Sequence, residues 1–184
     1  MKQEKSINGN AGIRKMVMAA LCLALAIIIP FIAGQVPQIA KMISPMHIPV
    51  LLAGYVAGPF WALGVGFVAP LLRSVLFGMP AMVPDAIVMA FELATYGFCS
   101  GFLFGLLPKK TPSIYISLIP SMLLGRLVWG AVKYVILGFM GDKFTFDLFL
   151  AGAFINAIPA IVIHILLIPI IVLALKKANL LYYQ

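Results

Sequence analysis

Acidic residues are scarce in this chain of 184 residues, which has 5 of them against 13 lysines and arginines. Charged residues of both signs make up only 10%, whereas a soluble domain carries about 25%. Hydrophobic residues account for 64%, and the mean hydropathy is +1.13. Because a soluble fold could not bury that much apolar surface, the composition indicates an integral membrane protein.

Motifs that would mark an enzyme are also missing. The chain has no GxxxxGK[ST] loop for ATP, no HExxH or Cys/His metal cluster and no GxSxG nucleophile elbow. Its acidic residues are scattered, so no carboxylate cluster could hold Mg²⁺. Cys22 and Cys99 lie in apolar runs and offer neither a disulfide framework nor metal spacing. We therefore expect no catalytic residue, no metal and no cofactor.

Long apolar runs, separated by glycine, proline and charge, predict the fold. Helices satisfy every backbone polar group inside hydrocarbon. The runs predict an all-α bundle of six transmembrane helices, over about 13–33, 47–57, 60–76, 85–107, 113–139 and 147–175, of which the second is short. Residues 1–12 and 178–184 are predicted to be tails around one transmembrane domain, 13–177.

Basic residues gather at the ends of these runs and orient the bundle. With six helices, three clusters fall on one side: Lys2, Lys5, Arg14 and Lys15; Lys109 and Lys110; Lys176 and Lys177. A five-helix or seven-helix chain would separate the first cluster from the last. The positive-inside rule then places both termini in the cytoplasm. Topology thus accounts for the net charge of +8, and we expect no nucleic acid partner.

Polar and aromatic side chains within the spans are candidates for binding a substrate. A charge at the bilayer centre costs roughly 2.5–3.5 kcal/mol on insertion scales, so it usually faces a cavity or a partner. Basic residues outnumber acids among these candidates, which suits an anionic or strongly polar ligand. The candidates are His47, Arg73, Glu92, Tyr96, Arg126, Trp129, Lys133 and Asn156.

Several polar residues of the spans also have a plainer interpretation. Glu92 could pair with Arg126 or Arg73 and only tie helices together. Lys133 could extend its ammonium to the membrane surface. Asn156 could join helices as well as bind a substrate. His164, in an apolar stretch, is favoured as a hydrogen-bonded core residue over a ligand contact.

The first predicted helix carries a pattern of small residues. Ala20 and Ala24 lie at i and i+4, on one face of the helix. Small residues at this spacing let another helix approach closely in lipid. The alternative is that they pack inside the bundle.

Three segments resemble a known family. ISPMHIPVLLAG (43–54), VAPLLRSVLFGMP (68–80) and MAFELATYG (89–97) are similar to segments of the substrate-binding (S) components of energy-coupling factor (ECF) vitamin transporters. The resemblance covers nearly the whole chain. It implies a bacterial cell-membrane protein that binds a vitamin near its extracellular side.

The resemblance also implies partners. S components dock on a transmembrane coupling subunit through an AxxxA surface of the first helix, here Ala20 and Ala24, and two cytosolic ATPases drive the cycle. The most similar members are those assigned to pantothenate, with vitamin B6 (pyridoxine) as the alternative. For pantothenate, Arg73, Arg126 or Lys133 would hold the carboxylate. Trp129 and Tyr96 would cover its apolar part, and Glu92 or Asn156 would take hydroxyls.

Two functions outside this family are also open. One is a stand-alone channel or proton-coupled carrier, with Glu92 and His164 as proton relays. The other is a structural or assembly protein of the membrane, in which the buried charges only pair.

Overall fold

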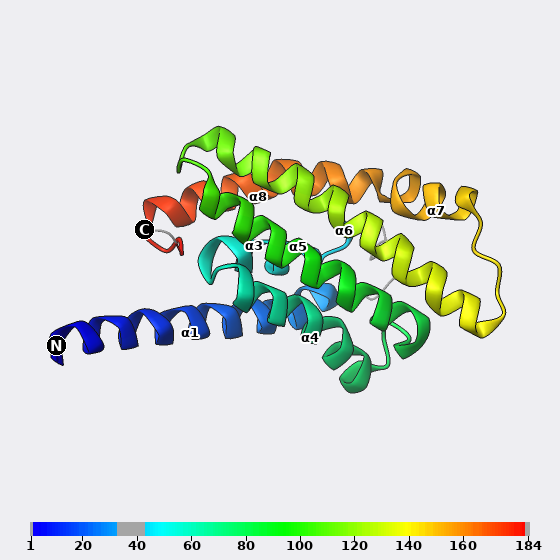
Figure 1. Ribbon diagram of the computed structural model, residues 1–184, viewed down its shortest axis with the longest axis horizontal. Coiled ribbons are helices and arrows are strands. Elements are labelled where there is room, and N and C mark those ends of the chain that lie inside the picture. Colours follow the sequence, from blue (N-terminus) through cyan, green and yellow to red (C-terminus); the bar gives the residue numbers. More distant parts are fainter. Residues whose placement is uncertain (1, 33–42, 183–184) are drawn as a thin grey trace.

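Helices make up the part of the chain that the structure describes. This computed structural model describes residues 2–32 and 43–182, with side chains over 12–31 and 43–182, and contains no strand in the described ranges. Figure 1 shows the helices lying lengthwise beside one another. They are α1 (Lys2–Ile32), α3 (His47–Val56), α4 (Pro59–Phe77), the π-helical turn η1 (Met82–Ala86), α5 (Ile87–Leu106), α6 (Thr111–Met140), α7 (Phe146–Ala153), the 3-10 turn η2 (Ile155–Ala157) and α8 (Ile158–Lys177).

Five segments of the described chain are long and apolar enough to cross a membrane: Gly12–Phe31, Pro59–Phe77, Met82–Leu106, Thr111–Met140 and Phe146–Lys177. The second predicted span corresponds to α3, which has only 10 residues. At 1.5 Å per residue α3 is about 15 Å long, half of a hydrocarbon core of roughly 30 Å. Because nine of its residues are buried, α3 is a short central helix surrounded by longer ones.

Two helix boundaries differ from those the sequence predicts. Helix α1 begins at Lys2 instead of residue 13, since Lys, Gln and Glu favour helix and no proline interrupts the polar start. The last predicted helix, 147–175, is broken into α7 and α8 by the turn η2. Pro159 at the start of α8 explains the break, because proline has no N–H and its ring clashes with the carbonyl four residues earlier.

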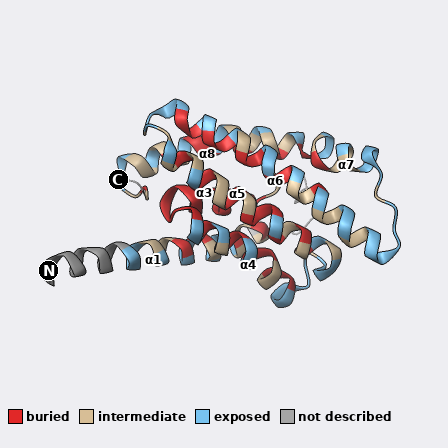
Figure 2. Cartoon of the chain, viewed as in Figure 1, coloured by how far each residue is buried: buried red, intermediate tan, exposed pale blue. Residues whose placement is uncertain are grey.

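Buried residues gather along α3 and on the facing sides of the helices around it (Figure 2). Helices α4 and α5 approach so closely that glycine is required between them. A Cβ added at Gly66 would lie 2.3 Å from the carbonyl oxygen of Leu93, and one added at Gly97 would lie 2.5 Å from that of Ala62. This is the small-residue packing expected between helices in lipid.

Alanine at Gly66 is therefore expected to destabilise the protein by about 1–3 kcal/mol, as overpacking does in a close-packed interior. Gly64, on the same helix, is the matched control, because a Cβ there meets nothing within 4 Å. Thermal unfolding of the detergent-purified variants would test this difference. Equal melting temperatures for Gly66→Ala and Gly64→Ala would contradict the close α4–α5 packing.

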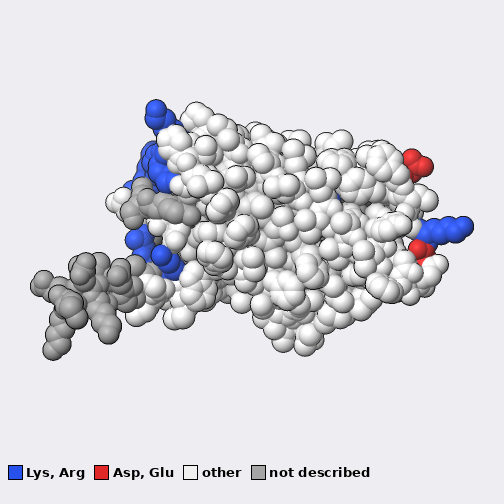
Figure 3. Space-filling model, viewed as in Figure 1, with Lys and Arg blue, Asp and Glu red and all other residues white. Residues whose placement is uncertain are grey.

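Charge is concentrated at the two ends of the bundle, with a largely uncharged surface between them (Figure 3). At one end, described members of the three basic clusters meet distant parts of the chain: Arg14 donates to the carbonyl of Asn179, and Lys176 donates to that of Lys109. The described end of the chain packs there too, where the Tyr182 amide donates to the Tyr55 carbonyl at 2.8 Å. We call this the basic end.

Candidate functional site

Five polar residues from four helices meet in the interior, and we call them the buried polar cluster. They are His47 of α3, Glu92 and Tyr96 of α5, Arg126 of α6 and His164 of α8, none more than 7% exposed. Ionisable groups are costly to bury in hydrocarbon, and such residues mark sites of function more often than of stability.

Glu92 is the centre of this cluster. Its Oε1 lies 3.0 Å from Nη1 of Arg126 and 3.5 Å from Nε2 of His47. The His47 ring stacks on that of His164, with centroids 5.8 Å apart and planes 20° apart. It also meets the Tyr96 ring edge-on at 5.4 Å. The cluster thus joins α3, α5, α6 and α8 around one ion pair.

The depth of the cluster follows from helix length. Glu92 lies about four turns before the end of α5 at Leu106, so it stands about 21 Å from the basic end. Arg126 lies about 22 Å along α6 from its start at Thr111. Measured from the basic end, Glu92 thus lies beyond the middle of α5 and Arg126 lies at about the middle of α6. Helix α3 begins at this depth with His47 and runs back toward the basic end.

Several atoms of the cluster lack a well-aligned hydrogen bond. Among the described residues, every fully buried side-chain nitrogen or oxygen without such a bond belongs to this cluster: His47 Nδ1 and Nε2, Glu92 Oε1, Tyr96 OH, Arg126 Nε and His164 Nε2. A buried polar group without a partner costs about 1–3 kcal/mol. A small polar molecule that supplied partners would recover this energy, so the arrangement can bind a polar ligand.

Trp129 and Lys133 lie beyond the cluster on α6. The Lys133 ammonium stands 4.8 Å from the centre of the Trp129 ring and 3.9 Å from Oδ1 of Asp85, in the turn η1. Trp129 also packs edge-on against Phe144 of the α6–α7 loop, at 6.0 Å. These two candidates therefore form a second layer on α6, about one to two turns farther from the basic end than Arg126.

Arg73 and Asn156 lie apart from the cluster contacts. Arg73 donates from Nη1 to the carbonyl of Ile27 on α1 at 2.7 Å. Its guanidinium also packs 4.6 Å from the ring of Phe31 and 5.7 Å from that of Phe77. Asn156 is exposed in the turn η2. The structure thus brings together four of the eight predicted residues and joins Glu92 to Arg126.

His164 is a member of the cluster that sequence reasoning assigned to the core. Its ring is buried, as expected, but it stacks on His47, 117 positions away in the chain. A lone histidine in an apolar helix gives no sign of its neighbour on another helix. The one available signal was that His47 and His164 both interrupt strongly apolar stretches.

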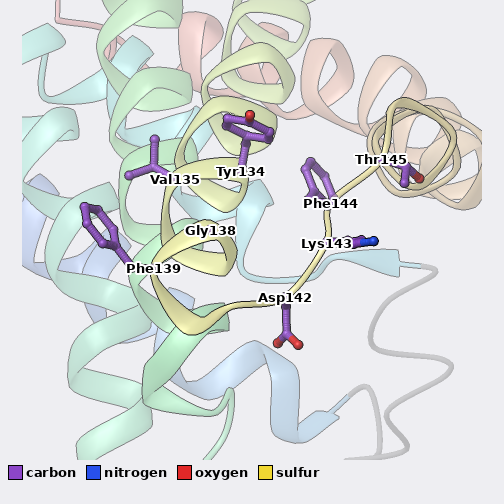
Figure 4. A pocket seen from close by; sticks show the side chains of 8 residues that line it. All are labelled: Tyr134, Val135, Gly138, Phe139, Asp142, Lys143, Phe144 and Thr145. Carbon is purple, nitrogen blue, oxygen red and sulfur yellow. The ribbon is translucent and has the colours of Figure 1, made fainter.

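The cavities lined by described residues include a small one and a large one. A small apolar cavity of about 50 Å³ lies beside Arg126, between α6, α8 and Phe154. A larger open groove of about 640 Å³ lies at the far end of α6, where Tyr134 and Phe144 extend into it (Figure 4). Its charged residues, Asp142 and Lys143, are exposed and already solvated, so they recognise a ligand less strongly than buried groups do.

Small residues of α1 occupy two different faces. Ala19, Cys22 and Ala26 are buried against the bundle. Ala20 and Ala24 are exposed. The pair with AxxxA spacing is therefore available to a partner, and other small residues of α1 make the internal contacts.

A comparison with models of protein families identifies the family of this chain. The family model described as "ECF transporter, substrate-specific component" matches residues 14–172. The chain belongs to this family. No curated protein and no solved structure gave a match.

The family gives the general role of this chain. The chain is an S component, the multi-helix membrane subunit of an ECF transporter that is specific for its substrate. The family implies a small-molecule substrate and association with ECF coupling and ATPase subunits. The family predicted from segments 43–54, 68–80 and 89–97 is confirmed, while the pantothenate subgroup stays a prediction.

Proposed function

We propose that this S component captures a small water-soluble vitamin from outside the cell and holds it at the buried polar cluster. The observation that carries the proposal is the gathering of five buried polar residues from four helices, His47, Glu92, Tyr96, Arg126 and His164, several of whose atoms lack a well-aligned hydrogen bond. A site built only for stability would be expected to satisfy its own hydrogen bonds.

The position of the cluster supports uptake from outside. If the basic end faces the cytoplasm, as the positive-inside rule requires, the cluster lies between the middle of the bundle and its outer end. The layer of Trp129 and Lys133 then lies between the cluster and the outer surface. Both termini are cytoplasmic in this orientation.

Delivery inward requires partners in this proposal. The exposed face of Ala20 and Ala24 supports docking of α1 on a transmembrane coupling subunit, and two cytosolic ATPases supply the energy. The S component then releases its vitamin on the inner side. The membrane is the bacterial cell membrane.

The candidate vitamins are pantothenate and, as the alternative, vitamin B6. Both are small and carry several hydrogen-bonding groups. Hydroxyl groups of either compound could pair with the free atoms of His47, Tyr96 and His164. Pantothenate would add a carboxylate directed at Arg126 or Lys133.

The first test is to identify what the protein retains. Mass spectrometry of protein purified from its native membrane is expected to detect a co-purified vitamin. Isothermal titration with that compound is expected to give a dissociation constant below about 1 μM, which corresponds to roughly 8 kcal/mol of binding free energy. Failure of every vitamin to bind more tightly than micromolar would contradict the proposal.

A purely structural role is the second candidate, because Glu92 and Arg126 do form an ion pair between α5 and α6. A double-mutant cycle on these two residues would measure their coupling. Strong coupling together with no ligand would favour this role. Uptake into liposomes without any ATPase would instead favour a stand-alone carrier.

A further inference from the structure

We infer that Glu92 sets the charge preference of the site, because it neutralises Arg126 and thereby selects uncharged, hydrogen-bonding ligands over carboxylates. This inference rests on the proposed function and concerns the class of vitamin that the cluster accepts. It reverses the order of the two candidates, placing an uncharged compound of the vitamin B6 type before pantothenate.

The charges of Arg126 and Glu92 are the main support for this inference. Arg126 and Glu92 lie 3.0 Å apart, so their charges cancel. His47 Nε2 lies 3.5 Å from the same Glu92 oxygen, and the His47 ring stacks on that of His164. The ion pair therefore brings no surplus positive charge to the site. A ligand carboxylate would leave one negative charge buried, which is costly in a low-dielectric interior.

The other cations of the spans are engaged elsewhere. Arg73 is bonded to the Ile27 carbonyl and packs on two phenylalanine rings. Lys133 has Asp85 at 3.9 Å. Neither brings a surplus positive charge to the atoms that surround Glu92.

The hydrogen-bonding chemistry of the cluster atoms supports the same preference. Glu92 Oε1 only accepts hydrogen bonds, while Tyr96 OH both donates and accepts. A neutral imidazole has one donor and one acceptor nitrogen. A hydroxyl, an amide or a ring N–H can serve such a mixed set. A carboxylate has no hydrogen to donate, so it cannot satisfy Glu92 and would be repelled by it.

Matched pairs of ligands that differ only in charge test the inference. Pyridoxine and 4-pyridoxate share one ring, with a hydroxymethyl group replaced by a carboxylate. Pantothenol and pantothenate differ by a primary alcohol in place of the carboxylate. Titration of the purified protein at neutral pH is expected to show that the uncharged member binds at least about tenfold more tightly in whichever pair binds. Tighter binding of the carboxylate member would overturn the inference.

Variants of the ion pair make the test specific. Glu92→Gln leaves Arg126 without its counter-charge, and is expected to shift the affinity ratio toward the carboxylate member by about tenfold or more. The double variant Glu92→Gln with Arg126→Gln removes both charges and is expected to restore the preference for the uncharged member. Monodisperse elution from a sizing column shows that each variant is folded. A ratio that Glu92→Gln leaves unchanged would overturn the inference.

The outcomes separate this inference from the proposed function. If the protein binds neither pair of ligands, the net charge of the co-purified vitamin tests the inference. An anionic vitamin overturns it, and an uncharged vitamin supports it. An anionic vitamin bound at the cluster would leave the proposed function intact. A protein that binds no vitamin at all would overturn both.

Discussion

Leucine in place of both Ala20 and Ala24 is expected to abolish vitamin uptake and assembly with the coupling subunit, while vitamin binding stays unchanged within about twofold. The two alanines are exposed on α1, so the added side chains extend from the surface of the bundle. Docking between helices in lipid depends on close approach, which small residues allow and leucines prevent.

Uptake of labelled vitamin by cells that carry all the subunits measures the first effect, and co-purification of the coupling subunit measures assembly. Ala131→Leu, at an exposed position of α6, is the matched control and is expected to leave uptake unchanged. Ala26 is fully buried against the bundle, so Ala26→Leu is expected to impair folding, unlike the substitutions at the exposed alanines. Normal uptake by the Ala20/Ala24 variant would exclude this face from docking.

Alanine in place of Arg126 is expected to weaken vitamin binding about a hundredfold or more. Removing one partner of a buried ion pair leaves the other charged and unpaired, which costs about 3–5 kcal/mol, and the stability of the protein is expected to fall as well. The substitution also deletes the unpartnered Nε of Arg126 that a ligand could use.

Arg73→Ala is the matched control, because Arg73 is equally buried at 7% exposed but contacts α1 instead of the cluster. It is expected to change vitamin affinity by less than about threefold. Titration calorimetry on folded, monodisperse protein measures both variants, and Arg126→Lys is expected to recover part of the affinity because it keeps the charge. Equal losses in Arg126→Ala and Arg73→Ala would show that the effect is one of general stability.

The helices themselves could be predicted from the sequence because apolar runs of membrane length, bounded by glycine, proline and charge, have few other solutions. The basic clusters also predicted which ends of the helices meet, and the contacts of Arg14 and Lys176 with the far end of the chain agree with that arrangement. The break between α7 and α8 was missed, although Pro159 was its visible cause.

The members of the site were harder to predict than the helices. Arg73 and Arg126 are the same residue type in the two apolar runs on either side of the run of Glu92, and only the rotation of each helix decides which of them faces Glu92. That rotation depends on close contacts between helices, such as those of Gly66 with Leu93 and of Gly97 with Ala62, and the sequence does not show which residues of two helices meet. The sequence predicted a surplus of positive charge at the site. In the packed bundle Arg126 pairs with Glu92, while Arg73 and Lys133 contact other groups.

The most direct test of the central claim, that the buried polar cluster is the substrate site, is a structure determined with the co-purified vitamin bound. We expect ligand atoms within hydrogen-bond distance of His47, Tyr96 and Arg126, with Glu92 still beside Arg126. A vitamin found instead in the open groove of Tyr134 and Phe144, with the cluster atoms untouched, would contradict the claim.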